Sequence, residues 1–316
     1  MRIVFLGTPE FAVPSLEMLC MEGYAVVAAV TQPDRPKGRG KKMLPPPVKV
    51  AAQALDIPVL QFERIRRAEC VAQLEALDMD LMITAAYGQI LSPKILDLPR
   101  LGCINVHGSL LPGYRGAAPI QWAIMNGEKT TGITTMFTDA GVDTGDMLLR
   151  RETPIGPDET GGELYARLAD IGAQVLKDTL RELEAGTLTR TPQDEGQASH
   201  YPMIDKKVAY IHWDRTAAQL HDHCRALDPA PFAWTRLEGQ SFKIARIDPA
   251  AWAGEMRQPG TILAADPKAG LIVACGDGAA RVCRLLAPGG KWMSDSEYLR
   301  GKKLPVGAIF EPSLPL

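Results

Sequence analysis

An amide and an imidazole stand two residues apart in the segment CINVHGSLLP, where a short apolar run gives way to a turn. Side chains at positions i and i+2 of a β-strand lie on the same face, so we expect Asn105 and His107 to point the same way. Polar side chains that end a strand in water would look the same. Residues elsewhere in the chain must therefore distinguish a site from a solvated strand end.

A loop rich in glycine and aspartate, DAGVDTGD, follows a later strand and offers His107 three carboxylates, Asp139, Asp143 and Asp146. An amide N–H can stabilise an oxyanion as it forms, and an imidazole can transfer a proton near neutral pH. A carboxylate can orient that imidazole and stabilise its charge. No serine or cysteine has an obvious base partner, since Ser109 shares only a loop with His107. The set favours direct acyl transfer between two bound substrates over a covalent intermediate.

The elements that must hold these residues alternate between strand and helix through residues 1–187. Continuous apolar strands separated by helices predict a doubly wound, mostly parallel sheet in an α/β, Rossmann-like domain. Ligands bind beyond the carboxyl ends of strands in such sheets, which is where CINVH ends. The expected strands are RIVFLG, YAVVAAVT, DLMITAAYG, CINVH and one on each side of DAGVDTGD, and the expected helices cover residues 9–23 and 160–185.

A second domain is predicted over residues 207–316, after a polar linker at 188–206 that contains two prolines. A helix over 216–227 is followed by closely spaced short strands with glycine turns, which predict a small OB-like β-barrel. The expected strands are AWTRL, SFKIARI, GTILAAD, GLIVACG, ARVCRLLAP and GAIF. From residue 206 onward, 15 lysines and arginines oppose 11 aspartates and glutamates, a balance of +4 in a chain of net charge −2. This balance gives weak support for a polyanionic partner.

Two common kinds of cofactor site are disfavoured. The first strand leads into GTPEFAVP, so Pro9 and Glu10 stand where a G-x-G-x-x-G turn would hold phosphates. The cluster HDHC lies in a helical pattern, where residues two apart do not share a face. We therefore expect no metal site at His221, His223 and Cys224.

The chain is expected in the cytoplasm. Its N-terminus, MRIVFLGTPEF, resembles a first core strand without a cleavage-like site. The six cysteines have no C-x-x-C spacing and are expected to be reduced thiols. No apolar run approaches about 20 residues, so no membrane span is expected. We expect a monomer.

Longer motifs carry a family resemblance. The segment NVHGSLLPGYRGAAPIQWAI, followed by DAGVDTGDML, resembles the signature of the folate-dependent formyltransferases. The likeness extends to TQPDRPKGRGKK, AYGQILSPKILDLP and KKVAYIHWDRTA. It implies an enzyme that uses 10-formyltetrahydrofolate as co-substrate and needs no metal. The basic loop and the C-terminal part resemble family members whose formyl acceptor is the amine of initiator methionyl-tRNA.

Matched by motif, the resemblance assigns roles to single residues. The catalytic trio falls on Asn105, His107 and Asp143, with Asp139 and Asp146 as alternatives in the same loop. The folate-contacting segment corresponds to Ser109, Leu110, Leu111 and Pro112. The tRNA-contacting residues correspond to Arg39, Lys41 and Lys42. The sequence departs from the family at Gly113 and Tyr114, where a basic–aromatic pair is frequent, and at Phe232, where glycine is common.

Alternatives remain open at this point. A formyltransferase for a small amine, such as a sugar nucleotide or purine precursor, and a formyltetrahydrofolate hydrolase could use the same trio. A third alternative is a tRNA-binding protein without activity. The loop at 34–42, with five basic residues against one acidic residue, favours a polyanionic acceptor. Such loops are usually only solvated, but this one follows the second strand, near the same crevice.

Overall fold

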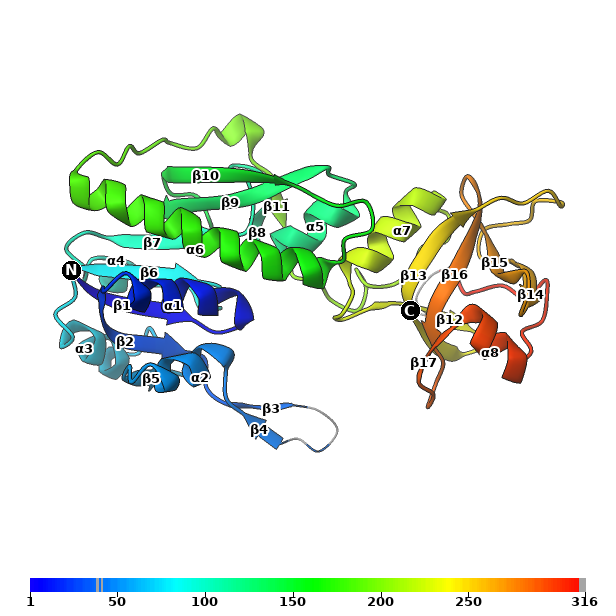
Figure 1. Ribbon diagram of the computed structural model, residues 1–316, viewed down its shortest axis with the longest axis horizontal. Helices are drawn as coiled ribbons and strands as arrows, with labels where there is room; N and C mark the ends of the chain where they lie inside the picture. Colours follow the sequence, from blue (N-terminus) through cyan, green and yellow to red (C-terminus); the bar gives the residue numbers. More distant parts are fainter. Residues whose placement is uncertain (38–39, 41, 313–316) are drawn as a thin grey trace. The chain divides into compact units, whose positions relative to one another are not determined.

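The computed structural model describes residues 1–37, 40 and 42–312 of the chain, which forms two compact units (Figure 1). Unit 1 contains Met1–Pro119, Thr130–Pro154 and Tyr165–Tyr201. Unit 2 contains Ile120–Lys129, Ile155–Leu164 and Pro202–Leu316. Most of the predicted linker, up to Tyr201, therefore packs with unit 1, and two short segments from the first half of the chain pack with unit 2. The exact domain boundaries stay a prediction.

Unit 1 is built on a seven-stranded sheet with strand order β10-β9-β7-β6-β1-β2-β5. Strands β5, β2, β1, β6 and β7 are parallel, whereas β9 is antiparallel to both β7 and β10. The predicted mostly parallel, doubly wound sheet is confirmed. Its strands are β1 (Arg2–Gly7), β2 (Ala25–Thr31), β5 (Val59–Gln61), β6 (Leu81–Ala85), β7 (Cys103–His107), β9 (Thr130–Phe137) and β10 (Met147–Pro154).

Helices cover both faces of this sheet (Figure 1). On one face lie α1 (Val13–Met21), which follows the short η1 (Glu10–Ala12), and the long α6 (Gly161–Ala185). The opposite face packs against α3 (Ala68–Glu75) and α4 (Pro93–Leu96), and α2 (Pro47–Ala54) packs against α1. Because apolar side chains fill both faces, the polar residues of the central strands are left for the strand ends.

Two short pairings complete unit 1. The hairpin β3 (Arg35–Lys37) and β4 (Lys42–Leu44) forms the two ends of the predicted basic loop. The two-residue strands β8 (Arg115–Gly116) and β11 (His200–Tyr201) pair in parallel, with η2 (Glu195–Gln197) just before β11.

Unit 2 contains an antiparallel sheet of order β12-β13-β16-β15-β14, with β17 paired to β16. Its strands are β12 (Ala233–Leu237), β13 (Gln240–Ala250), β14 (Ile262–Asp266), β15 (Gly270–Cys275), β16 (Gly278–Leu286) and β17 (Trp292–Ser294). Helices α7 (Ala217–Ala226) and α8 (Asp295–Gly301) pack against this sheet. Unit 2 also includes most of α5 (Pro119–Met125), which belongs to its segment Ile120–Lys129. The predicted small C-terminal β domain is confirmed, and its sheet is antiparallel.

The C-terminal segment connects the two edges of this sheet. Ile262 N–H donates to the Ala308 carbonyl at 2.8 Å, beside β14, whereas Glu311 N–H donates to the Arg236 carbonyl of β12 at 2.8 Å. The predicted strand GAIF was wrong as a regular strand, since only an isolated bridge, Thr261 to Ile309, forms there. The pairing on this side ends at Phe310, because the next residue, Glu311, bonds to β12 at the other edge of the sheet.

Phe232, a departure from the family pattern, has a local explanation in the structure. Its φ of +67° lies in the left-handed region, which favours glycine. The phenyl ring packs on Trp292 at a centroid distance of 4.4 Å, and the Lys243 ammonium lies 5.7 Å from the Phe232 centroid. The ring contacts thus offset the backbone strain that the side chain introduces.

The histidines of HDHC face different environments, as expected for residues two apart on a helix. His221 is partly exposed on α7, whereas His223 and Cys224 are buried. The side of α7 that bears His223 and Cys224 therefore faces the interior of unit 2. Burial lowers the pKa of His223 to about 4.

This shift predicts acid sensitivity of unit 2. Between pH 6.5 and 4 the unfolded chain binds a proton at His223 that the folded chain does not, so stability is full above pH 6.5 and falls as the pH decreases toward 4. The loss from this group amounts to about 3 kcal/mol. Urea unfolding of wild type and His223→Leu at pH 7 and pH 4 measures it. An equal pH dependence in both proteins would contradict the assignment.

In the part of the chain that the structure describes, no helix combines the length and apolarity needed to cross a membrane.

Candidate active site

Asn105 lies at the carboxyl end of β7, beside Thr84 on the neighbouring strand β6. The Thr84 hydroxyl donates a hydrogen bond of 2.8 Å to Asn105 Oδ1. This bond occupies the amide oxygen and fixes the orientation of the group, so the amino end of the amide is presented as the donor. A donor held in this way is suited to a developing oxyanion.

His107 ends the same strand and is buried, with 6% of its surface exposed. Its Nδ1 lies 3.6 Å from Asp143 Oδ1, and its Nε2 lies 3.0 Å from the Tyr114 carbonyl oxygen. Both ring nitrogens therefore face oxygen atoms. These two contacts hold the ring from both sides and fix its orientation.

Asp143 is held from a second side. Its Oδ2 accepts a 2.9 Å hydrogen bond from the backbone N–H of Gly116. Gly116 has φ +95°, and a Cβ there would lie 2.5 Å from the Tyr201 carbonyl oxygen across the β8–β11 pairing. Only glycine satisfies this position, so the backbone donor for Asp143 depends on the short β8–β11 pair.

Of the three candidate carboxylates, the structure brings Asp143 to His107. Asp139 instead stabilises its own loop, because its Oδ1 accepts from Gly141 N–H at 2.9 Å and from the Thr144 hydroxyl at 2.6 Å. The structure shows no such contact to His107 for Asp146 among the described residues. The catalytic roles themselves stay predictions.

The predicted folate segment is mostly turned inward. Ser109, Leu111 and Pro112 are buried, and only Leu110 is partly exposed. The Ser109 hydroxyl donates to the Gly113 carbonyl at 2.7 Å, and Thr134 Oγ1 donates to the Ser109 carbonyl at 2.7 Å. These bonds make the turn rigid and use polar groups that were expected to reach folate. The hydroxyl and the carbonyl of Ser109 are therefore engaged within the protein.

Tyr114, at the other departure from the family, has φ +59° and stacks on Tyr201 at a centroid distance of 4.8 Å. The stack holds the backbone whose carbonyl oxygen faces His107. Gly113 has no side chain to place beside this stack.

Among the predicted tRNA-contacting residues, Lys42 is exposed on β4, whereas Arg39 and Lys41 lie outside the described residues. The base of the hairpin is fixed by ion pairs. Lys49 Nζ lies 2.8 and 2.9 Å from the carboxylate oxygens of Asp34, and its hydrogen bond lowers the pKa of Asp34. The only acidic residue of the loop is thus neutralised at its base.

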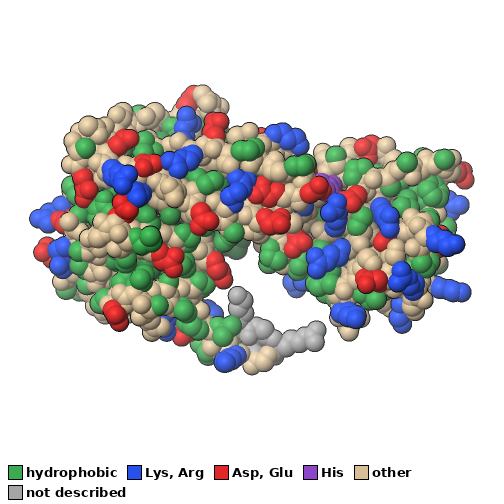
Figure 2. Space-filling model, viewed as in Figure 1, with side chains coloured by type: hydrophobic (Ala, Val, Ile, Leu, Met, Phe, Trp, Pro, Cys, Tyr) green, Lys and Arg blue, Asp and Glu red, His purple; other side chains and the backbone are tan. Residues whose placement is uncertain are grey.

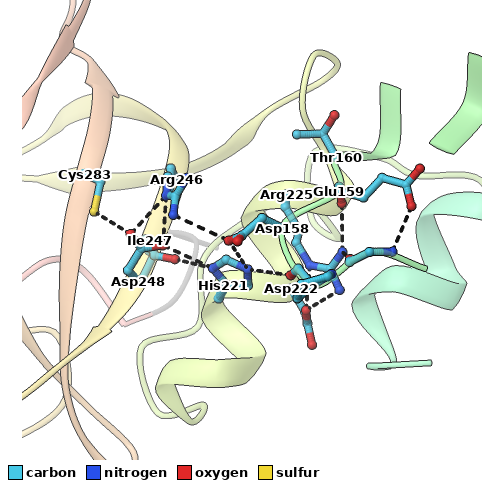
Figure 3. A network of polar contacts seen from close by, with 12 residues as sticks. Asp158, Glu159, Thr160, His221, Asp222, Arg225, Arg246, Ile247, Asp248 and Cys283 are labelled. Atoms are coloured by element: carbon cyan, nitrogen blue, oxygen red, sulfur yellow. Dashed lines mark hydrogen bonds and ion pairs between the residues drawn. The ribbon is translucent and has the colours of Figure 1, made fainter. Parts of the chain in front are cut away.

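One group of side chains in unit 2 has the composition of a metal site (Figure 3). Asp158, His221 and Asp248 place one ligand atom each within 4.8 Å of one another. The Arg246 guanidinium already contacts both carboxylates, at 2.9 Å from Asp248 and 3.5 Å from Asp158. His221 Nδ1 lies 2.8 Å from the Ile247 carbonyl oxygen. We interpret the group as an ionic network that joins residue 158, α7 and β13.

Arg225 extends this network to the segment before α6 (Figure 3). The Arg225 side chain is largely buried and donates to the carbonyls of Gly156 and Glu159 at 3.1 and 2.8 Å. Its Nε also bonds to Asp222 at 2.7 Å. Contacts of this kind explain why residues 155–164 pack with unit 2, which local sequence patterns do not reveal.

Known protein families match both parts of the chain. Residues 1–180 match the formyl transferase family, and residues 203–303 match its C-terminal domain. The chain belongs to the formyltransferase family. Relatives that match it over nearly their whole length are methionyl-tRNA formyltransferases.

The sequence identity to two of these relatives is high over the full chain. The methionyl-tRNA formyltransferase of Ruminiclostridium cellulolyticum is 52% identical over 308 residues, which cover 97% of this chain and 98% of the relative. That of Acetivibrio thermocellus is 51% identical over 309 residues, with 98% and 99% covered.

A solved structure of an N-formyltransferase from Helicobacter canadensis, in complex with folinic acid and dTDP-3-aminofucose, has a TM-score of 0.64. It is 18% identical and covers 91% of this chain and 98% of its own. This likeness shows the fold alone.

Proposed function

We propose that this protein transfers the formyl group of 10-formyltetrahydrofolate to the amino group of initiator methionyl-tRNA, giving formylmethionyl-tRNA for translation initiation. The observation that carries the proposal is the meeting of His107 with Asp143, 3.6 Å apart, at the strand end that also bears Asn105. The full-length likeness to methionyl-tRNA formyltransferases supports the same acceptor.

The three side chains divide the reaction between them. As the methionyl amine attacks the formyl carbon, Asn105 donates a hydrogen bond to the oxygen that gains negative charge. His107 takes the proton that the amine loses and returns a proton to N10 of the folate, whose bond to the formyl carbon breaks. Asp143 stabilises the protonated ring of His107 between these two events.

Because tRNA is a large acceptor, the enzyme must bind it at surfaces away from the reacting groups. Lysine and arginine side chains gather over unit 2 on the face shown in Figure 2, in accord with the +4 balance of residues 206–316. The exposed lysines and arginines of residues 206–316 include Lys206, Lys207, Lys243, Arg284, Lys291 and Lys302. Such a surface binds nucleic-acid phosphates with little sequence preference. This surface and the basic hairpin would each bind phosphates of the tRNA. We further propose that the enzyme acts in the cytoplasm as a monomer.

A panel of acceptors tests the proposal. Purified protein with 10-formyltetrahydrofolate should formylate charged initiator tRNA at least about 10²-fold faster, per kcat/KM, than a nucleotide-linked amino sugar, because only tRNA can use the basic surfaces. Release of tetrahydrofolate without an acceptor should be slower still. Faster transfer to the amino sugar would identify a small-amine formyltransferase, and fast release in water alone would identify a hydrolase.

The threonine beside Asn105 provides a milder prediction. Thr84→Val keeps the size of the side chain but removes the bond to Asn105 Oδ1, so the amide can turn its oxygen toward the reacting group. We expect kcat to fall roughly fivefold, the value of one neutral hydrogen bond. Steady-state formylation at saturating substrates measures this. Unchanged turnover would show that the amide is oriented by other contacts.

A further inference from the structure

Gln193 lies in the segment that the sequence indicated as a linker, yet its side-chain amide contacts the loop that carries Asp143. Gln193 Nε2 donates to the carbonyl oxygens of Asp143 at 2.9 Å and of Gly145 at 2.8 Å. Its Oε1 accepts from Arg115 Nε at 2.9 Å. Both N–H groups and the oxygen of the amide are therefore used in contacts to residues about 50 or more positions away.

Arg115 holds this amide in place. It is 1% exposed, and its terminal nitrogens make two bonds to the Glu195 carboxylate, at 3.0 and 2.8 Å. A buried guanidinium is tolerated only when it is paired and hydrogen-bonded, and here Gln193 and Glu195 accept three of its five N–H donors. The next residue, Gly116, donates to the Asp143 carboxylate itself. Strand β8 thus supports Asp143 in two ways. Gly116 bonds to the Asp143 carboxylate directly, and Arg115 bonds to Gln193, which bonds to the Asp143 carbonyl.

The Asp143 loop needs such support. Asp143 has φ +56°, a left-handed conformation that an aspartate adopts at an energetic cost, and the neighbouring Val142 is 51% exposed. Hydrogen bonds to the carbonyls of residues 143 and 145 fix the backbone on both sides of Thr144. Without them, the carboxylate could turn away from His107, and a displacement of about 1 Å is enough to impair catalysis.

We propose that Gln193 is a positioning residue for the formyl transfer, which acts by holding the backbone of Asp143 so that its carboxylate faces His107. This inference rests on the proposed function. The hydrogen bonds of the Gln193 side chain go to two backbone carbonyls and to Arg115, so we expect its effect on turnover to pass through Asp143.

The test uses Gln193→Glu, which keeps the shape and the bond from Arg115 but turns the two donated bonds into repulsion against carbonyl oxygens. The matched control is Gln197→Glu, four residues along, because Gln197 Nε2 donates only to Asp194 Oδ2 on the exposed surface. Gln193→Glu should lower kcat roughly 10- to 100-fold and leave the KM values for folate and tRNA within about threefold. Gln197→Glu should leave all three unchanged.

A double-mutant cycle separates positioning from a general structural role. Single-turnover rates are measured for wild type, Gln193→Glu, Asp143→Asn and the double variant. If Gln193 acts through Asp143, its substitution should cost less than about twofold once the carboxylate is gone. An equal loss in both backgrounds, or an unchanged kcat in folded Gln193→Glu, would overturn the proposal.

Gln193→Met provides the same measurement if the added charge prevents folding, since it removes the three bonds without introducing repulsion. It should show the same dependence on Asp143, with a smaller loss of kcat. The wild-type rate on methionyl-tRNA tests the proposed function separately. An inactive wild type would refute that function, whereas an active wild type with unaffected Gln193 variants would refute only the positioning role.

Discussion

Replacing His107 by alanine should lower the turnover of formyl transfer roughly 10²- to 10⁴-fold, the contribution of a positioned general acid–base group. Asn105→Ala should cost roughly 10²- to 10³-fold, as expected for one oxyanion donor. Asp143→Asn should lie in the same range as His107→Ala, because an amide cannot stabilise the protonated ring. Turnover at saturating folate and methionyl-tRNA measures all three, with urea midpoints to show that each variant is folded.

The loop offers a matched control for Asp143→Asn. Asp139→Asn also removes a carboxylate from the same loop, but both hydrogen bonds of Asp139 end on a single oxygen, which asparagine retains. Its turnover should stay within about twofold of wild type. Loss of activity in Asp139→Asn but not in Asp143→Asn would move the carboxylate role to Asp139. More than about a tenth of wild-type turnover in any trio variant would refute the role assigned to that residue.

The second large effect is expected at the basic loop. Arg39→Ala should lower kcat/KM for methionyl-tRNA roughly 10- to 100-fold, the value of a charge-assisted hydrogen bond to phosphate. The prediction for Arg39 rests on the sequence. At the base of the hairpin, Asp34 pairs with Lys49 and Arg35 pairs with Glu63. Folate binding should stay unchanged.

Salt dependence separates the members of this loop. Lys41→Ala and Lys42→Ala should weaken tRNA binding more mildly, and each should reduce the slope of log K against log salt concentration by about one. Titrations of tRNA binding at several ionic strengths provide the slopes. A flat salt dependence in wild type, or normal turnover of Arg39→Ala on tRNA, would favour a small amine as the acceptor.

The helices and strands that have a periodic apolar pattern could be predicted from the sequence. Helix α6 shows a 3.6-residue apolar pattern, and Leu164, Leu168 and Leu180 are all fully buried in the structure. Strand β7 was predicted from its apolar run and the turn that follows. From this strand, the shared face of Asn105 and His107 followed directly, because the side chains of a strand alternate.

The contacts that complete the site could not be predicted from local patterns. Strands β8 and β11 have two residues each, too few for any periodicity, and they pair across 85 positions of the chain. Gln193 stands in a polar segment rich in turn-forming residues, where nothing marks one glutamine as hydrogen-bonded to a distant loop. The closest signal was a lone arginine, Arg115, directly after the SLLPGY turn.

Direct transfer between two bound substrates is the central claim about the chemistry, and rapid-quench mixing with formyl-labelled 10-formyltetrahydrofolate tests it most directly. Excess enzyme is mixed with the labelled folate, and methionyl-tRNA is added to one half of the reaction. We predict that the label passes from folate to tRNA in a single exponential phase, with no label on the protein in either half. Label that accumulates on the protein before tRNA is added, and is then transferred to tRNA, would contradict the account.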